Sequence, residues 1–294
     1  MKTPVEDTYC EAFDGLVSRM LVTAADRKRL KRAALDSTAL PCTVLGESEG
    51  GLERFLSKSE TPDGREGALI QVWVNKMKDA KEKLEFELGR RIRQGILVVP
   101  STSLFNALES EEKLDMTYRV GNCGDGFESY EQYLGREFIN VPIMMGSFRI
   151  ERFMGFAPGI MGGNLWFYCD NEKNALRVLD AAENAIQKVE GVVLTFREGC
   201  SAGSKAGGKF KHIGPSTNEC YCPGLKRSLG SSMVPEGVES IPEVVLNGLS
   251  LDAVKEAMRR AILAVDGMDG LVRISAGNYG GRLGRHKISL KELV

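Results

Sequence analysis

The chain has 294 residues, of which 43% are hydrophobic and 27% are charged, and its formal net charge is −1. This composition is typical of a globular protein with a sizeable core, and the near-zero charge provides no general attraction to nucleic acid or to an anionic membrane. No apolar run reaches the roughly 18–20 residues that a membrane span needs. The seven cysteines lack the density of a disulfide scaffold. We expect a cytoplasmic protein with reduced thiols and with no nucleic-acid or membrane partner.

The first half of the chain predicts strand, helix, strand, strand, helix and strand. A helix is expected from its cap Asp26 to about residue 37, and residues 77–94 place an apolar residue every four positions on a charged helix. The segment 60–65, ETPDGR, contains a Pro-Asp-Gly turn signal. The expected strands are 18–25, 42–46, 68–74 and 96–99.

The second half repeats this order, with helices capped by Asn171 and Ser250. Its expected strands are 165–169, 192–196, 241–247 and 271–275. Strand-helix-strand units of this kind make a split β-α-β arrangement. We therefore predict an α+β fold with two ferredoxin-like lobes, residues 1–144 and 145–294, each an antiparallel sheet with helices on one face. The stretch 101–164 is expected to be long and irregular.

Common nucleotide-binding and hydrolase motifs are missing, since the chain has no P-loop, no GxGxxG after a strand, no HExxH and no GxSxG. Cys220, Cys222 and His212 lie near one another in sequence, but their spacing does not match a zinc site. We expect no bound metal.

Glu243 is the first candidate for chemistry. In a strand over 241–247, alternation places Val244 and Leu246 on one face and Glu243 on the other. If helices cover the Val244 face, the carboxyl group of Glu243 lies among apolar neighbours. Desolvation there favours its protonated form, which can act as an acid. The simpler alternative is a solvated glutamate on the strand surface.

Three further segments are candidates for ligand binding. The turn 215–219, PSTNE, offers hydroxyl and amide groups, and the loop 201–211 is basic enough to hold an anionic group. Residues 275–284 carry four glycines beside Asn278, and glycines let backbone N–H groups come close to a ligand. Each segment has a simpler interpretation as a surface turn or loop.

Several short motifs carry a family resemblance in their wording and their order. The tail 274–284 reads ISAGNYGGRLG, and residues 6–13 read EDTYCEAF. Between them come ETPDGR at 60–65, GDGF at 124–127, GGN at 162–164, STN at 216–218 before Cys222 and Pro223, PEGV at 235–238 and NGL at 247–249. Together these motifs resemble the formylmethanofuran:tetrahydromethanopterin formyltransferases, one-carbon enzymes of methanogenic archaea with counterparts in methylotrophic bacteria.

The resemblance implies two ferredoxin-like lobes per subunit and assembly into a homodimer or homotetramer. It also implies an acyltransferase that moves a formyl group from formylmethanofuran to N5 of tetrahydromethanopterin. Methanofuran and tetrahydromethanopterin are then carrier substrates, and no metal or prosthetic group is bound permanently. Glu243 matches the family's active-site glutamate, which would donate to the oxygen of a tetrahedral intermediate, a contribution of about 3–4 kcal/mol. The expected substrate contacts are Ser216, Thr217, Asn218, Asn247, Ser275, Asn278, Gly280 and Gly281.

Other segments depart from the family's pattern, in regions expected to line the substrate cleft. They are residues 45–51, 93–102, 165–169 and 196–200. The main alternative is therefore a non-catalytic or hydrolase-associated subunit of a formyltransferase complex. A third possibility, a ferredoxin-like nucleic-acid binder, rests only on the basic loop and on the charged residues 27–32, because the aromatic motif of RNA-binding sheets is missing.

Overall fold

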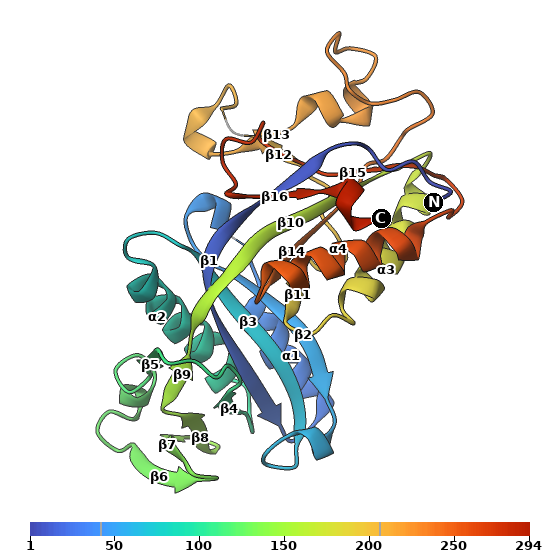
Figure 1. The fold of residues 1–294 in the computed structure, drawn as a ribbon. Coiled ribbons are helices and arrows are strands. Elements are labelled where there is room, and N and C mark those ends of the chain that lie inside the picture. Colours follow the sequence, from blue (N-terminus) through green and yellow to red (C-terminus); the bar gives the residue numbers. More distant parts are fainter. Residues whose placement is uncertain (42, 206) are drawn as a thin grey trace. The chain divides into compact units, whose positions relative to one another are not determined.

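The computed structural model describes residues 1–41, 43–205 and 207–294 (Figure 1). Contacts gather them into two compact units, Gly15–Pro158 and Met1–Asp14 with Gly159–Val294. No helix in the described part of the chain is long and apolar enough to cross a membrane. The boundary expected between residues 144 and 145 stays a prediction, because packing does not by itself define independently folding lobes.

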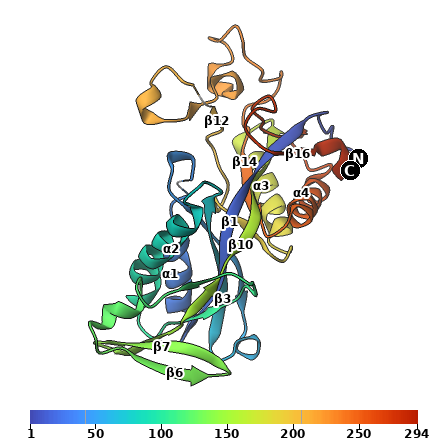
Figure 2. The ribbon, with the colours of Figure 1, turned by 60° about the vertical axis from the view of Figure 1, so that its left-hand side comes forward.

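In the unit of residues 15–158, strands pair antiparallel in the order β2-β3-β1-β4. Two helices pack together on β3, as Figure 2 shows, and one follows the first strand while the other follows the third. This order confirms the predicted split β-α-β arrangement. The elements are β1 (Tyr9–Ala24), α1 (Arg27–Thr38), β2 (Glu49–Leu56), β3 (Glu66–Asn75), α2 (Ala80–Arg91) and β4 (Ser103–Asn106).

The strand predicted at 42–46 is wrong. Residues Thr43–Leu45 form a short 3₁₀ turn, and Cys42 lies outside the described residues. The strand at this place in the fold is β2, which hides from sequence patterns because it buries Glu49 and Glu53. Glu53 accepts hydrogen bonds from Arg19 Nε and Gln71 Nε2, each at 2.8 Å, so its charge is compensated inside the unit.

The strand predicted at 96–99 is also wrong. The chain continues from α2 into a π-helical turn over Ile92–Leu97, and the fourth strand is β4. Gly95 in this turn lies against Ser37 of α1, where a Cβ atom would come within 2.6 Å of the backbone. A short apolar run cannot be assigned to strand or helix from periodicity alone, and here the helical alternative forms.

The stretch 101–164 is not irregular as predicted. After β4, three strands continue the sheet, with β8 parallel to β4 and the pairs β8-β7 and β7-β6 antiparallel. Charged pairs on these strands, such as Arg149 with Glu131 at 2.7 Å, remove the apolar alternation that would have revealed them. The elements are β5 (Lys113–Asp115), β6 (Ser129–Tyr133), β7 (Arg136–Ile143), β8 (Gly146–Glu151) and β9 (Phe153–Gly155).

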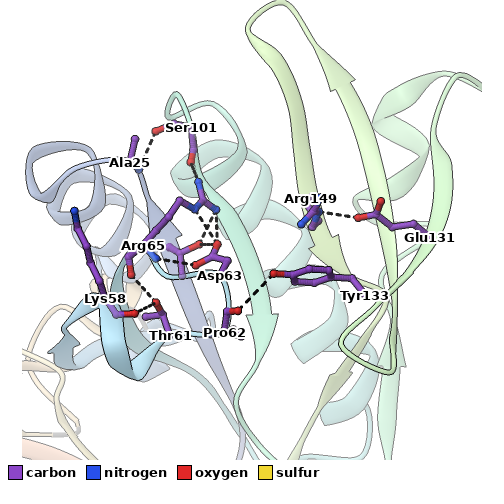
Figure 3. A network of polar contacts seen from close by, with 11 residues as sticks. Ala25, Lys58, Thr61, Pro62, Asp63, Arg65, Ser101, Glu131, Tyr133 and Arg149 are labelled. Carbon is purple, nitrogen blue, oxygen red and sulfur yellow. Dashed lines mark hydrogen bonds and ion pairs between the residues drawn. The ribbon is translucent and has the colours of Figure 1, made fainter.

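The turn of the ETPDGR segment closes one end of this unit (Figure 3). Arg65 donates to Asp63 Oδ2 at 2.8 Å, to the Ser101 carbonyl at 2.5 Å and to Thr23 Oγ1 at 2.8 Å. The guanidinium thus ties the end of β1 and the turn before β4 to the start of β3. The motif has a structural role in the fold.

In the unit of residues 1–14 and 159–294, strands pair antiparallel in the order β11-β14-β10-β15, the same split β-α-β order. The predicted caps are confirmed, because Asn171 accepts from the Asn174 amide at 2.9 Å and Ser250 accepts from the Ala253 amide at 3.1 Å. The principal elements are β10 (Ala157–Cys169), α3 (Glu172–Ile186), β11 (Val192–Leu194), β14 (Glu243–Gly248), α4 (Leu251–Val265) and β15 (Leu271–Ser275). Three short strands complete this unit: β12 (Ser204–Lys205), β13 (Ser216–Thr217) and β16 (His286–Ser289), the last paired with the first residues of β1.

The two faces of this second sheet differ in what covers them. Val244 and Leu246 of β14 lie in the fully buried core with the apolar sides of α3 and α4. Trp166 of β10 belongs to a separate apolar cluster with Tyr168, Val234 and Val238. The prediction that the Val244 side faces the helices, which leaves Glu243 on the other face, is confirmed.

Candidate active site

Glu243 begins β14 and lies directly opposite Trp166 of β10 in the strand register. Trp166 Nε1 donates a hydrogen bond to Glu243 Oε1 at 2.9 Å. On its other side, the Glu243 backbone exchanges two hydrogen bonds of 2.8 Å with Cys200. Burial raises the pKa of Glu243 to about 7, although hydrogen bonds from the side chains of Trp166 and Cys200 act in the opposite direction. Near neutral pH, about half of the molecules therefore carry a protonated carboxyl group here.

Glu243 lines two cavities of the same unit. The larger has a volume of about 520 Å³, within the range of small-molecule sites, and lies between the start of α3 and the loops around Cys200 and Tyr221. The smaller has a volume of about 40 Å³ and is strongly polar. Its lining consists of Asn164, Trp166, Ser204, Asn218, Glu243, Gly277, Asn278 and Tyr279. The site can thus hold a ring system on one side of Glu243 and a group of a few atoms on the other.

Three of the predicted substrate contacts lie at these cavities with Glu243. Thr217 lines the larger cavity, Asn278 lines the smaller, and Asn218 lines both. The side-chain amide of Asn278 donates to the Tyr9 carbonyl at 3.3 Å, which anchors it to β1. Asn218 makes its hydrogen bonds to other described residues through backbone atoms and its carbonyl oxygen, so its carboxamide is available to a ligand.

The other predicted contacts do not line either cavity in the described structure. They are Ser216, Asn247, Ser275, Gly280 and Gly281. Asn247 is fully buried and accepts a hydrogen bond from the Gly162 amide at 2.9 Å, where β10 shifts its register. Ser275 is buried opposite Trp166. A substrate-binding role for these five residues stays a prediction.

Glu11 is a site residue that sequence reasoning missed. Four backbone N–H groups of the glycine-rich tail donate to its carboxylate: Tyr279 at 2.6 Å, Gly281 at 2.5 Å, Leu283 at 3.0 Å and Gly284 at 2.7 Å. Burial acts to raise the pKa of Glu11, but these bonds outweigh burial and lower it. The open glycine backbone thus binds a carboxylate of the chain itself. The available signal was that Glu11 and the tail both belong to the segments with a family resemblance.

Trp166 and Cys200 were also missed as neighbours of Glu243. Both lie in segments that depart from the family pattern, and only the strand register shows that they meet β14. Among the residues that the structure describes, no group of three or more His, Cys, Asp or Glu side chains could hold a metal ion. Lys205 of the basic loop forms an ion pair with Glu219.

Comparison with known protein families decides the relationship. The family model described as formylmethanofuran-tetrahydromethanopterin formyltransferase matches residues 1–143, and the model of its proximal lobe matches residues 146–293. The chain belongs to this formyltransferase family. The resemblance drawn from short motifs is therefore confirmed.

Individual relatives of this formyltransferase-family chain match it over nearly its full length. A formyltransferase-like protein of Archaeoglobus fulgidus is 54% identical over 291 residues, which cover 99% of this chain and 96% of the relative. The solved formyltransferase of Methanosarcina barkeri has a TM-score of 0.92 at 38% identity, covering 99% of this chain and 98% of its own. This match confirms the predicted fold class.

A second solved structure is the formyltransferase/hydrolase complex of Methylorubrum extorquens with methylofuran. It matches with a TM-score of 0.90 at 34% identity, covering 98% of this chain and 96% of that one. Four relatives named formyltransferase-like are 49–54% identical to this chain, whereas four named formyltransferase are 39–42% identical.

Proposed function

We propose that the chain is an acyltransferase that moves a formyl group from formylmethanofuran to N5 of tetrahydromethanopterin. The observation that carries this proposal is the carboxyl group of Glu243, which has a pKa of about 7 and lines both cavities. The names of the relatives support the same reaction. A proton donor between a large and a small cavity suits the transfer of a small group between two large carriers.

The reaction needs such a donor because a formamide is a poor acyl donor. N5 attacks the formyl carbon, and the carbonyl oxygen gains the proton of Glu243 as the tetrahedral intermediate forms. When the intermediate collapses, this proton returns to Glu243 and the bond from carbon to the methanofuran nitrogen breaks. The proton that N5 loses ends on the departing amine, so that all atoms and charges balance and no redox partner is needed.

The polar lining supports the positioning of the formyl group. The Asn218 carboxamide lines both cavities beside Glu243 and can donate to a substrate oxygen on either side. Asn278 is fixed by its bond to β1, so it presents a polar wall of constant shape. Ser216, Thr217, Asn247, Ser275, Gly280 and Gly281 complete the proposed set of substrate contacts, on the strength of the motif match.

The test uses the purified protein with formylmethanofuran and tetrahydromethanopterin, and it measures 5-formyl-tetrahydromethanopterin. Glu243→Gln should keep the melting temperature and the affinity for both carriers but lose about 10²–10³ in kcat. The matched control is Glu256→Gln, a glutamate on the outer surface of α4, which should keep its kcat. Wild-type turnover in Glu243→Gln would remove this residue from the mechanism.

A second candidate function is a non-catalytic or hydrolase-associated subunit. It is supported by the solved relative that is part of a formyltransferase/hydrolase complex, and by the higher identity to relatives named formyltransferase-like. Carrier binding without product in the assay above would favour it. A homodimer or homotetramer, a cytoplasmic location, ferredoxin-like lobes and the absence of a resident cofactor stay predictions that rest on the family resemblance and the cysteine content.

A further inference from the structure

We propose that Trp166 is a positioning residue that determines which oxygen of Glu243 carries the proton. The inference rests on the proposed function, because it concerns the same carboxyl group. The indole N–H can donate but cannot accept, and it lies 2.9 Å from Glu243 Oε1. Oε1 must therefore be the accepting, carbonyl-type oxygen of the neutral acid, and the proton that the reaction uses lies on Oε2.

The indole is held in this position from several sides. Trp166 is only 8% exposed, and its ring meets the edge of the Tyr221 ring at a centroid distance of 4.8 Å. Gly277 lies against the indole so closely that a Cβ atom would come within 2.7 Å of Cζ2. The strand register fixes its backbone between Glu243 of β14 and Ser275 of β15. The N–H direction is therefore set by the fold before any substrate binds.

The other titratable groups that face Glu243 do not compete with this bond. The Cys200 thiol also hydrogen-bonds the carboxyl group, and a thiol can donate or accept, so it fits either location of the proton. Burial raises the pKa of Cys200, of Tyr279 and of Cys10, the last to about 12. These three groups are uncharged near neutral pH. The carboxyl groups of Glu172, Glu198 and Glu239 line the larger cavity.

Removal of the indole donor has a definite sign. The hydrogen bond from Trp166 lowers the pKa of Glu243, so Trp166→Phe should raise it further, by about one unit or more. Because Glu243 acts as an acid in the proposed reaction, the alkaline limb of the kcat profile should move up by the same amount. The maximal kcat should fall about 10-fold, since the proton is no longer confined to one oxygen. A merely structural role of Trp166 would lower kcat without this shift of the limb.

The decisive experiment observes the proton without any substrate. In pH-difference infrared spectra, the C=O stretch of protonated Glu243 should titrate with a midpoint near pH 7 and should vanish in Glu243→Gln. In Trp166→Phe the band should move to higher frequency, because its carbonyl oxygen loses a donor, and its midpoint should rise. Tyr221→Phe, which keeps the ring beside the indole, should leave band and midpoint unchanged. An unshifted band and midpoint in Trp166→Phe would overturn the proposal.

A second variant keeps the test independent of how Trp166→Phe folds. Gly277→Ala places a methyl group against the indole, which must move, and the midpoint of Glu243 should again rise. An unchanged midpoint in Gly277→Ala would overturn the claim that the packed indole controls the proton. These spectra need neither carrier. Infrared shifts without formyl transfer in the assay would thus keep the proton assignment and reject the proposed function.

Discussion

The Glu11 carboxylate provides the most quantitative prediction. Its Oε1 accepts from the amides of Tyr279 and Gly281, and its Oε2 accepts from those of Leu283 and Gly284. Glu11→Gln keeps the shape of the side chain but replaces one oxygen with an NH₂ group. Two of the four N–H groups then face another donor in a site where the side chain is 1% exposed. No rotation of the amide can satisfy all four.

Two buried N–H groups without an acceptor cost about 1–3 kcal/mol each, so the tail should be destabilised by about 2–6 kcal/mol. Hydrogen exchange measures this directly, because the protection of an amide reports the free energy of its opening. Exchange at residues 279–284 should accelerate by at least about 30-fold, the factor that about 2 kcal/mol produces. Asp14→Asn is the matched control. Its carboxylate is held by Arg285 and His286 at the surface, so its loss should cost less than about 1 kcal/mol.

The effect should also depend on pH with a fixed sign. Because the pKa of Glu11 is lower in the folded state than the ordinary value of 4.5, its contribution is present above that value and is lost as the pH falls through the folded-state pKa. The difference in exchange between wild type and Glu11→Gln should therefore narrow below about pH 4. Equal exchange rates of the two proteins at pH 7 would refute this account of the glycine-rich tail.

Three further variants test the fold, each by the midpoint of urea unfolding. Gly95→Ala should lose about 1–3 kcal/mol, because its methyl group would enter the space of Ser37. Ser250→Ala should lose about 1 kcal/mol, since it removes the cap of α4. Arg65→Lys should lose about 1–3 kcal/mol, because a lysine cannot reach all the partners in Figure 3, and an unchanged midpoint would show that the turn holds without the guanidinium fork.

The helices were predictable from the sequence because their signals are local. Asp26, Asn171 and Ser250 each cap a helix through an amide three residues further on, and such a contact needs no information from the rest of the chain. β2 was not predictable, because its buried Glu49 and Glu53 depend on partners far away in sequence. Strand patterns fail where burial is made possible by distant charges.

The same distinction holds for the candidate site. The face of Glu243 follows from alternation within one strand, so the sequence predicted it. Its contact with Trp166 depends on the register between β14 and β10, and the contact of Glu11 with the tail joins residues about 270 positions apart. No local pattern encodes either contact, although the family motifs marked both Glu11 and the tail.

These two glutamates belong to one unit, and their environments move their pKa values in opposite directions. Glu11 is buried but receives four backbone N–H groups, so its charged form is stable and it serves as a fixed anchor. Glu243 is buried with too few donors to offset desolvation, so its pKa rises to about 7 and its proton can leave and return. A carboxyl group that is always charged cannot protonate an intermediate, whereas one that titrates near neutral pH can. This difference in the number of donors assigns the structural role to Glu11 and the chemical role to Glu243.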